Sequence, residues 1–437
     1  MKITNDVCKK IKELHGVDCA PYSAYDHQRH GKQPLVESLF TYMGVPRSRL
    51  HDCCGRFGGC YYVDVPNIFR NFDADVDDPE SYDFYYTDEY IGAIIDSGAQ
   101  IVYRLGITIE WGTKKYVSYP PADFEKWARI CEHIIRHYNE GWKDGYHYNI
   151  EYWEIWNEPE NPPMWQGTRE EFFELYRISS KHLKVCFPNL KIGGYGSCGF
   201  YAVFNEKRKK SEFYQSFLTW FDDFLKMVKE NGCPLDFYTW HIYTPIIEEV
   251  VLSARYARAK LDEYGFFDTE SHLNEWNYGV EGSALIEREN TVGASFVAAT
   301  LAVMQEERVD LAQYYDASRM SSYNGLLTYR TQEFTPVAHV FAAFNKLFKA
   351  ENELKVEKDE REPYSIAASD GENILTLISN YGKEKSSLVV ELPEKMRARL
   401  YKLTDSDAFV LEGEYVTPAL TFACDKNATY FIEAERI

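Results

Sequence analysis

Short apolar runs alternate with helix-length stretches over the first 348 residues of the chain. Eight of the runs are rich in branched and aromatic residues and end in a polar tip, as expected for buried strands. They span residues 14–19, 47–51, 100–105, 150–156, 190–194, 235–241, 267–275 and 309–315. The stretches between them, including residues 124–138, 213–228 and 294–305, carry apolar residues at helical spacing.

This alternation predicts an α/β fold with a parallel sheet. Eight strand–helix units fit a (β/α)8 TIM barrel over residues 1–348, and a doubly wound open sheet is the alternative. Beyond a last helix candidate at 337–348 the pattern changes to short strands separated by turn residues such as Asp370-Gly371. These strand candidates span residues 364–368, 373–379, 386–392, 397–402, 419–422 and 429–433. Residues 349–437 are therefore predicted to form a small C-terminal antiparallel β-sandwich domain.

The composition suits a large folded protein that acts on neutral ligands. Of the 437 residues, 45% are hydrophobic, which is enough for a barrel core and an appended domain. The formal charge is 48 − 68 = −20, and a chain this acidic repels phosphate backbones and anionic membranes. Nucleic acid and membrane partners are therefore not expected.

The cellular compartment is predicted from the N-terminus and the cysteines. Residues 1–6 contain no apolar signal core, and no later apolar run is long enough to span a bilayer. We therefore expect a cytoplasmic protein whose ten cysteines are reduced thiols. Whether the chain forms a homo-oligomer is left open.

One cluster of potential metal ligands precedes the third strand candidate. His51, Cys53, Cys54 and Cys60 lie close in sequence, but no second well-spaced cysteine pair accompanies them. Because adjacent cysteines seldom bind one ion together, loop thiols are favoured over a zinc site.

Charged, amide and aromatic residues occupy the tips of six of the eight predicted strands. They are Arg49-Leu50-His51-Asp52, Arg104 with Glu110-Trp111, Asn157-Glu158, Trp240-His241-Ile242-Tyr243, Asn274-Glu275-Trp276-Asn277 and Tyr314-Tyr315-Asp316. In a (β/α)8 barrel these tips meet at one face, where active sites lie. A purely structural barrel has no need of such a set, so it predicts an active site.

Two of the tips carry a carboxylate beside an amide and an aromatic residue, namely Trp156-Asn157-Glu158 and Asn274-Glu275-Trp276. Glycosidic cleavage requires two carboxyl groups on opposite sides of the anomeric carbon. Two acids a few ångströms apart do not both ionise readily, so the pKa of one of them is expected to be raised and to keep it protonated. The pair therefore indicates glycoside hydrolysis.

In combination these motifs resemble the retaining (β/α)8 glycoside hydrolases. The Glu275-Trp276-Asn277 form, His241-Ile242-Tyr243 and the trailing β domain resemble glycoside hydrolase family 39 most. The resemblance implies that Glu158 is the general acid and base and Glu275 the nucleophile. It also implies carboxyl groups roughly 5–5.5 Å apart and a double-displacement mechanism.

The resemblance also implies roles around the two acids. Asn157 would bind the sugar 2-hydroxyl, Tyr243 would hydrogen-bond the nucleophile, and His241 would lie beside it. Arg49 would orient Glu275, and His51 would reach the sugar. Trp276 and Asp316, at their strand tips, are added as substrate-binding candidates. No metal or organic cofactor is required.

The expected activity is exo-acting release of terminal sugars from oligosaccharides, with β-xylosidase as the first expectation. A β-glucosidase, a β-galactosidase, an arabinose-releasing enzyme or an endo-acting glycanase remains open. In other classes, a non-catalytic sugar-binding barrel remains possible. A nicotinamide oxidoreductase would rest on Gly194-Tyr195-Gly196-Ser197-Cys198-Gly199, a glycine motif that we interpret as a flexible loop.

Several neighbouring residues have alternative interpretations. Glu154 is predicted to be a core or supporting acid and Glu160 a surface residue of the loop. Glu270 is predicted to be the start of the seventh strand, with the nucleophile role in place of Glu275 as its alternative. Trp111 and Trp165 are further candidates for stacking on sugar rings. His27 and His30 are interpreted as solvated. The chain also begins almost directly at the first barrel strand, without the N-terminal strand that relatives of this kind add to their β domain.

Overall fold

Eight parallel strands close into a barrel in the order in which they occur along the chain. They are β2 (Glu13–Asp18), β3 (Arg47–Leu50), β4 (Gln100–Leu105), β5 (Tyr152–Ile155), β6 (Lys191–Ser197), β7 (Phe237–Tyr243), β8 (Glu270–Asn277) and β9 (Leu311–Tyr314). The computed structural model describes residues 1–19, 35–53, 63–279, 285–318, 321, 323–331, 333–406 and 408–437. His27, His30, Cys54 and Cys60 lie outside these ranges. The predicted barrel is confirmed.

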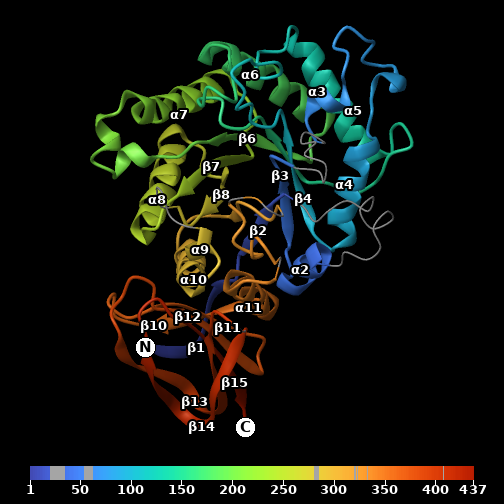
Figure 1. The fold of residues 1–437 in the computed structure, drawn as a ribbon. Helices are drawn as coiled ribbons and strands as arrows, with labels where there is room; N and C mark the ends of the chain where they lie inside the picture. Colours follow the sequence, from blue (N-terminus) through green and yellow to red (C-terminus); the bar gives the residue numbers. More distant parts are fainter. Residues whose placement is uncertain are drawn as a thin grey trace.

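Helices follow the strands and surround the barrel (Figure 1). They are α2 (Leu35–Met43), α3 (Val65–Ile68), η1 (Pro79–Ser81), α4 (Tyr85–Asp96), α5 (Phe124–Glu140), α6 (Arg169–Cys186), η2 (Tyr201–Val203), η3 (Arg208–Lys210), α7 (Glu212–Asn231), α8 (Ile247–Tyr264), α9 (Leu285–Arg288), α10 (Thr291–Glu306) and α11 (Pro336–Ala350). None of the helices in the described part of the chain is long and apolar enough to cross a bilayer.

Local sequence determines where these helices begin and end. The α5 helix starts at Asp123, whose side chain accepts a hydrogen bond from the Lys126 N–H, and it ends at Gly141, which takes a left-handed φ of 76°. Thr168 and Glu171 form a reciprocal capping box at the start of α6. Both α5 and α6 bury one apolar face, as the helical spacing in the sequence predicts.

A seven-stranded sheet forms the second part of the molecule, in the order β1-β10-β11-β12-β15-β13-β14. Its strands are β1 (Lys2–Lys10), β10 (Asn352–Glu357), β11 (Tyr364–Ser369), β12 (Asn373–Ser379), β13 (Ser386–Leu403), β14 (Phe409–Cys424) and β15 (Thr429–Arg436). Lys2 of β1 also pairs with Glu391 of β13, so the sheet bends back on itself around a core of its own. The predicted C-terminal antiparallel region is confirmed, although two of its predicted strands are the single long β13.

The first strand corrects the predicted domain boundary. Residues 1–10 were assigned to the barrel, but β1 pairs antiparallel with β10 from Lys2–Glu357 to Lys10–Asn352. The chain therefore does contribute an N-terminal strand to the β domain. Both termini lie in this part of the molecule (Figure 1).

The two parts share a continuous apolar interface. Helices α10 and α11 lie between the barrel and the sheet (Figure 1), and the main core extends into Ile366, Leu377 and Phe431 of the sheet. Polar contacts complete the interface, among them the hydrogen bond between the Ser295 and Ser379 hydroxyls at 2.9 Å. Because the barrel core continues into the sheet, the sheet is a packed part of the fold rather than a loosely tethered appendage.

Ile3 provides a test of the β1 assignment because it is fully buried in the sheet core while Val7, on the same strand, is 59% exposed. We expect Ile3→Ala to lower the free energy of unfolding by about 2–4 kcal/mol, through lost burial and an unfilled cavity. Val7→Ala should change it by less than about 0.5 kcal/mol. Urea denaturation followed by circular dichroism measures both, and equal effects would contradict the pairing of β1 with β10.

Candidate active site

The backbone after β5 turns sharply and is held by the neighbouring strand. Trp156 and Glu158 take left-handed φ angles of 71° and 42°, which side chains rarely adopt. The Glu158 N–H donates to the carbonyl oxygens of Gly196 at 2.8 Å and Tyr195 at 3.1 Å, both on β6. Such strain persists only where the surroundings impose it, and here it directs the Glu158 side chain into the barrel mouth.

The glycine motif on β6 explains how the two strands approach so closely. A Cβ atom on Gly196 would lie 2.7 Å from Asn157 Oδ1, and a Cβ on Gly199 would overlap the His241 carbonyl oxygen. Both glycines also take positive φ angles. The segment is mostly strand, Lys191–Ser197, so the predicted flexible loop is wrong. Its glycines allow backbone to pack against the tips of β5 and β7.

Glu275 lies on β8 with both carboxylate oxygens held. The Arg49 guanidinium donates from Nη1 to Glu275 Oε1 at 2.8 Å, and the Tyr243 hydroxyl donates to Glu275 Oε2 at 2.7 Å. In the register of β7 and β8, His241 pairs with Glu275. The structure thus brings the second predicted acid, with Arg49 and Tyr243, to the same end of the barrel as Glu158.

Arg49 is fully buried and contacts four side chains at once. Besides Glu275, Nε donates to Glu154 Oε2 at 2.7 Å, Nη2 to Asn157 Oδ1 at 2.6 Å and Nη1 to Asp18 Oδ1 at 3.1 Å. Glu154 also accepts a hydrogen bond from Asn274 at 2.7 Å, so its predicted supporting role is confirmed. One cation therefore links the ends of β2, β3, β5 and β8.

Two of the acids that contact Arg49, Glu154 and Asp18, have pKa values shifted in opposite directions. Burial would raise the pKa of Glu154, but the adjacent Arg49 charge and hydrogen bonds outweigh it and lower the pKa. At Asp18 burial prevails over Arg49 and, with the charge of Glu275, raises the pKa well above its usual range. Arg49 therefore favours the ionised form of Glu154 more than that of Asp18.

His241 lies between the two predicted catalytic acids. Its Nδ1 is 2.7 Å from Glu158 Oε1 and 3.4 Å from Glu275 Oε2, and the three atoms that these side chains offer lie within 4.8 Å of one another. Because an ionised carboxylate only accepts hydrogen bonds, the imidazole Nδ1 is the donor. The carboxylates therefore face each other across a single ring nitrogen.

This arrangement changes the expected location of the proton. Burial would lower the pKa of His241, but the charge of Glu275 and the hydrogen bond to Glu158 raise it. Burial would raise the pKa of Glu158, but the hydrogen bond and charge of His241 lower it. The expectation that one acid of the pair has a raised pKa is therefore not met at Glu158, and the two shifts favour a proton on the imidazole over one on Glu158.

A second group of polar residues borders Glu275. His51 Nε2 lies 3.7 Å from Glu275 Oε1 and 3.4 Å from Asp52 Oδ1, and the Tyr315 hydroxyl donates to Asp52 Oδ2 at 3.0 Å. Burial and the nearby Arg49 charge lower the pKa of His51 well below its usual range, while burial raises the pKa of Asp52 to about 6. Asp52 and Tyr315 were in the predicted tips but were not singled out.

Asp316 follows Tyr315 and is buried at the end of β9. Its carboxylate accepts hydrogen bonds from the Ser318 N–H at 3.2 Å and the Ser321 hydroxyl at 2.9 Å. Burial raises its pKa to about 7. Its carboxylate therefore organises the loop beside Tyr315, and the structure shows no direct hydrogen bond from it to either catalytic candidate among the described residues.

The Trp276 side chain lies apart from the polar residues around Glu158 and Glu275. Its indole is 1% exposed and meets the Tyr314 ring edge-on at 5.3 Å, and Tyr314 in turn packs on Phe341 of α11. Trp276 therefore faces the helix layer, on the opposite side of β8 from Glu275. Trp165 is buried against Trp156 as well.

Of two other acids, Glu160 differs from expectation, whereas Glu270 lies where it is predicted, at the start of its strand. Glu160 is buried rather than on the surface, and its Oε1 accepts hydrogen bonds from the Cys198 N–H at 2.8 Å and the Ser197 hydroxyl at 3.0 Å. Burial raises its pKa to about 8. Glu270 begins β8 and pairs with Lys191 and His272 at the opposite end of the strand from Glu275, which excludes it from this site.

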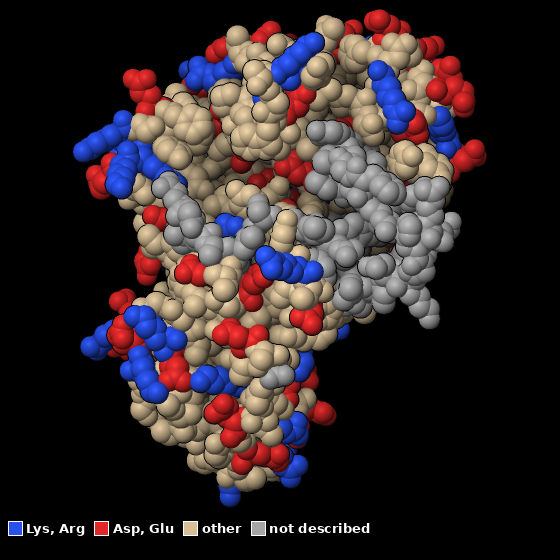
Figure 2. Space-filling model, in the orientation of Figure 1, with Lys and Arg blue, Asp and Glu red and all other residues tan. Residues whose placement is uncertain are grey.

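The surface around these residues is concave. Figure 2 shows Asp and Glu side chains, in red, inside a hollow of the barrel part. At its side, a pocket of about 420 Å³ is lined by residues that include Tyr243, Thr244, Arg208 and Tyr214. The Glu158 and Glu275 side chains keep 13% and 6% of their surface exposed, so both can contact a ligand although most of each is buried.

Comparisons with known proteins agree with this geometry. A family model described as glycosyl hydrolases family 39 matches residues 56–354. A curated relative named beta-xylosidase, from Geobacillus stearothermophilus, is 27% identical over 199 residues, which cover 41% of this chain and 34% of the relative. The chain thus spans about a third of the length of that relative.

Two solved structures share the whole architecture. A glucosidase from Croceicoccus marinus has a TM-score of 0.77 and 21% identity, and the alignment covers 100% of this chain and 98% of that one. A monomeric beta-xylosidase from Caulobacter crescentus has a TM-score of 0.73 and 15% identity, with 100% and 99% covered. At these identities the likeness establishes the fold.

The hydrogen bonds around Arg49 can be tested through the free energy of unfolding of the protein. Arg49→Met leaves Glu154 and Glu275 without their buried cation, and we expect it to lower the free energy of unfolding by about 3–5 kcal/mol. Arg47→Met, two residues earlier on β3, breaks a partly exposed ion pair with Glu13 and should cost about 1 kcal/mol. Chemical denaturation measures both, and a loss at Arg49 no larger than at Arg47 would contradict the network.

Proposed function

Because the chain belongs to glycosyl hydrolases family 39, we propose that it is a retaining glycoside hydrolase with Glu275 as nucleophile and Glu158 as general acid and base. The observation that carries the proposal is the separation of the two carboxylates. Their facing oxygens lie within 4.8 Å of each other, which suits direct attack on the sugar and leaves too little room for an inverting enzyme's water.

In the first step Glu275 attacks the anomeric carbon while Glu158 protonates the departing oxygen. Arg49 and Tyr243 each hold one oxygen of Glu275, so the carboxylate is oriented before the sugar arrives. The proton for the departing oxygen is the one carried by His241, which reaches Glu158 through the 2.7 Å hydrogen bond.

In the second step the roles reverse. Once Glu275 is esterified, it has lost the negative charge that does most to raise the pKa of His241. Glu158, now ionised, removes a proton from water as the water attacks the anomeric carbon and releases Glu275. The proton then returns from Glu158 to His241, and the site is restored.

Asn157 is suited to bind the sugar 2-hydroxyl. Its Oδ1 accepts from Arg49 at 2.6 Å, which fixes the amide, while its buried Nδ2 has no hydrogen-bond partner among the described residues. A buried N–H of this kind is costly unless a ligand accepts from it. The free Nδ2 therefore supports the assignment of Asn157, and His51, 3.7 Å from Glu275, is placed to reach the same sugar.

We further propose that the substrate is a short oligosaccharide with a terminal xylose. The curated relative is named beta-xylosidase, and one of the structural neighbours is a beta-xylosidase while the other is a glucosidase. Terminal glucose is therefore the second candidate. A cytoplasmic location is part of the proposal, and the eight described cysteines, all free thiols, support a reducing compartment.

The roles of the two acids are tested by substitution. We expect Glu275→Gln to lower kcat by at least about 10³-fold, because no covalent intermediate can form. Glu158→Gln should retain the first step with activated aryl glycosides and lose the second, so that the glycosyl-enzyme accumulates. Glu270→Gln, on the same strand as Glu275, is the matched control and should remain active.

Product stereochemistry tests the mechanism, and a panel of aryl β-xylosides, β-glucosides and β-galactosides tests the sugar. Proton NMR of the first-formed product should show the retained anomer, with β-xylosides turned over fastest. An inverted first product would exclude Glu275 as nucleophile, and preference for β-glucosides would replace xylose by glucose without changing the mechanism.

The position of the proton is tested by pH dependence. His241 holds its proton above the pH at which an ordinary imidazole loses it, so loss of that proton defines the alkaline limb of kcat/KM. In His241→Asn the two carboxyl groups must keep the proton themselves, and they release it at lower pH. We therefore expect the alkaline limb to move to lower pH with xylobiose as substrate.

His272→Asn is the control for this measurement, since His272 is buried at the other end of β8 and contacts Glu270. It should leave the alkaline limb in place. An alkaline limb that is the same in wild type and His241→Asn would show that the proton resides elsewhere.

A further inference from the structure

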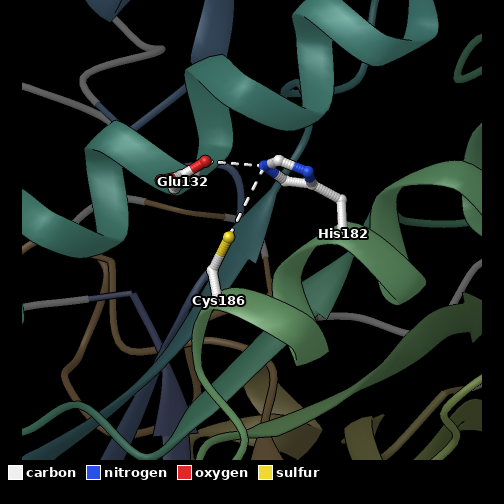
Figure 3. A group of neighbouring side chains, drawn as sticks. All are labelled: Glu132, His182 and Cys186. Carbon is white, nitrogen blue, oxygen red and sulfur yellow. Dashed lines mark hydrogen bonds and ion pairs between the residues drawn. The ribbon is translucent and has the colours of Figure 1, made fainter.

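Three side chains of different ligand types meet between two helices outside the barrel wall. Glu132 projects from α5 toward His182 and Cys186 of α6 (Figure 3). His182 Nε2 is 2.6 Å from Glu132 Oε2 and 3.8 Å from Cys186 Sγ, and all three atoms lie within 4.8 Å of one another. The catalytic mechanism uses none of these groups.

We propose that Glu132, His182 and Cys186 bind a zinc ion that links α5 to α6. Carboxylate oxygen, imidazole nitrogen and thiolate sulfur are all ligands of Zn²⁺ in proteins. His182 and Cys186 are four residues apart on one helix, so they project from the same face. Glu132 approaches that face from the neighbouring helix, which gives three converging ligands from two elements.

The distances require only small movements to become a tetrahedral site. With zinc–ligand bonds of about 2.0–2.3 Å, tetrahedral geometry separates the imidazole nitrogen from the carboxylate oxygen by roughly 3.3 Å and from the sulfur by roughly 3.6 Å. The nitrogen–oxygen pair must open from 2.6 Å and the nitrogen–sulfur pair close slightly from 3.8 Å.

A neighbouring side chain orients the carboxylate ligand. Arg136 donates to Glu132 Oε1, which orients the carboxylate and leaves Oε2 turned toward His182. On binding, zinc would release the Cys186 thiol proton to solvent and replace the hydrogen bond between His182 and Glu132 by two metal–ligand bonds.

The fourth coordination position would be taken by water. The side chains of His182 and Glu132 are 31% and 14% exposed, so the site is open to solvent on one side. Cys186 is the last residue of α6, shortly before β6 begins at Lys191. The site therefore lies toward the amino ends of the barrel strands, opposite the catalytic acids, and zinc here would stabilise the barrel rather than take part in hydrolysis.

Cobalt(II) and zinc(II) alone are sufficient probes. We expect the full-length protein, reduced and freed of metal by a chelator that is then removed, to bind one Co²⁺ with a near-ultraviolet cobalt–thiolate charge-transfer band. Equimolar Zn²⁺ should abolish that band by displacement. Zn²⁺ should also raise the melting temperature, because it binds the folded chain.

Single substitutions show which cysteine supplies the thiolate that gives the cobalt charge-transfer band. Cys186→Ser should abolish the band, and His182→Gln and Glu132→Gln should weaken Co²⁺ binding more than about 10-fold. Cys198→Ser is the essential control, because Cys198 lies beside Glu158, which with His241 and Glu275 forms the other cluster in the described chain that could hold a metal. It should keep the band in full.

Several outcomes would overturn the zinc site. They are the absence of a thiolate band at tenfold excess of Co²⁺, survival of the band in Cys186→Ser, and its loss in Cys198→Ser. Circular dichroism of each variant shows whether it is folded. The proposed hydrolase function does not depend on this result, since the catalytic acids are tested by their own substitutions.

Discussion

One buried guanidinium determines how the barrel presents its acids. Arg49 is inaccessible to solvent and makes hydrogen bonds to side chains from three other strands. An unpaired charge at this depth would be strongly unfavourable, so carboxylates must surround it, and once they do their geometry is fixed. Arg49 positions both Glu275, the nucleophile candidate, and Asn157, the amide beside Glu158. The same buried hydrogen bonds therefore stabilise the barrel and align the site.

Much of the fold and of the site could be predicted from local pattern. Barrel strands are buried on both faces, so they appear as apolar runs, and Gln100–Leu105 was predicted to the residue. Polar residues at the ends of such runs must share one face of a closed barrel, which is why Glu158, Glu275, Arg49 and His241 could be grouped before their distances were known. That inference needs only strand direction and order.

What could not be predicted depends on contacts between distant segments. In β1 only Ile3 is fully buried, so the strand has no alternation to reveal it until β10 is placed beside it. Glu160 is buried where Ser197, the last residue of β6, and the Cys198 backbone that follows it donate hydrogen bonds to its carboxylate. The orientation of Trp276, by contrast, was predictable, because neighbours along a strand face opposite sides and Glu275 faces the barrel interior.

The pairing of β1 with β10 makes the barrel an insertion within the sheet domain. Lys10 and Asn352 lie opposite each other in the ladder although the whole barrel separates them in sequence, and the Met1 ammonium group is 2.7 Å from Glu362 Oε1. During synthesis β1 leaves the ribosome before the barrel and stays unpaired until the barrel has been made and has brought its two ends together. Excision of the sheet domain as an independent unit would accordingly require two cuts and a new connection, and a single truncation near residue 350 would leave β1 as an orphaned edge strand.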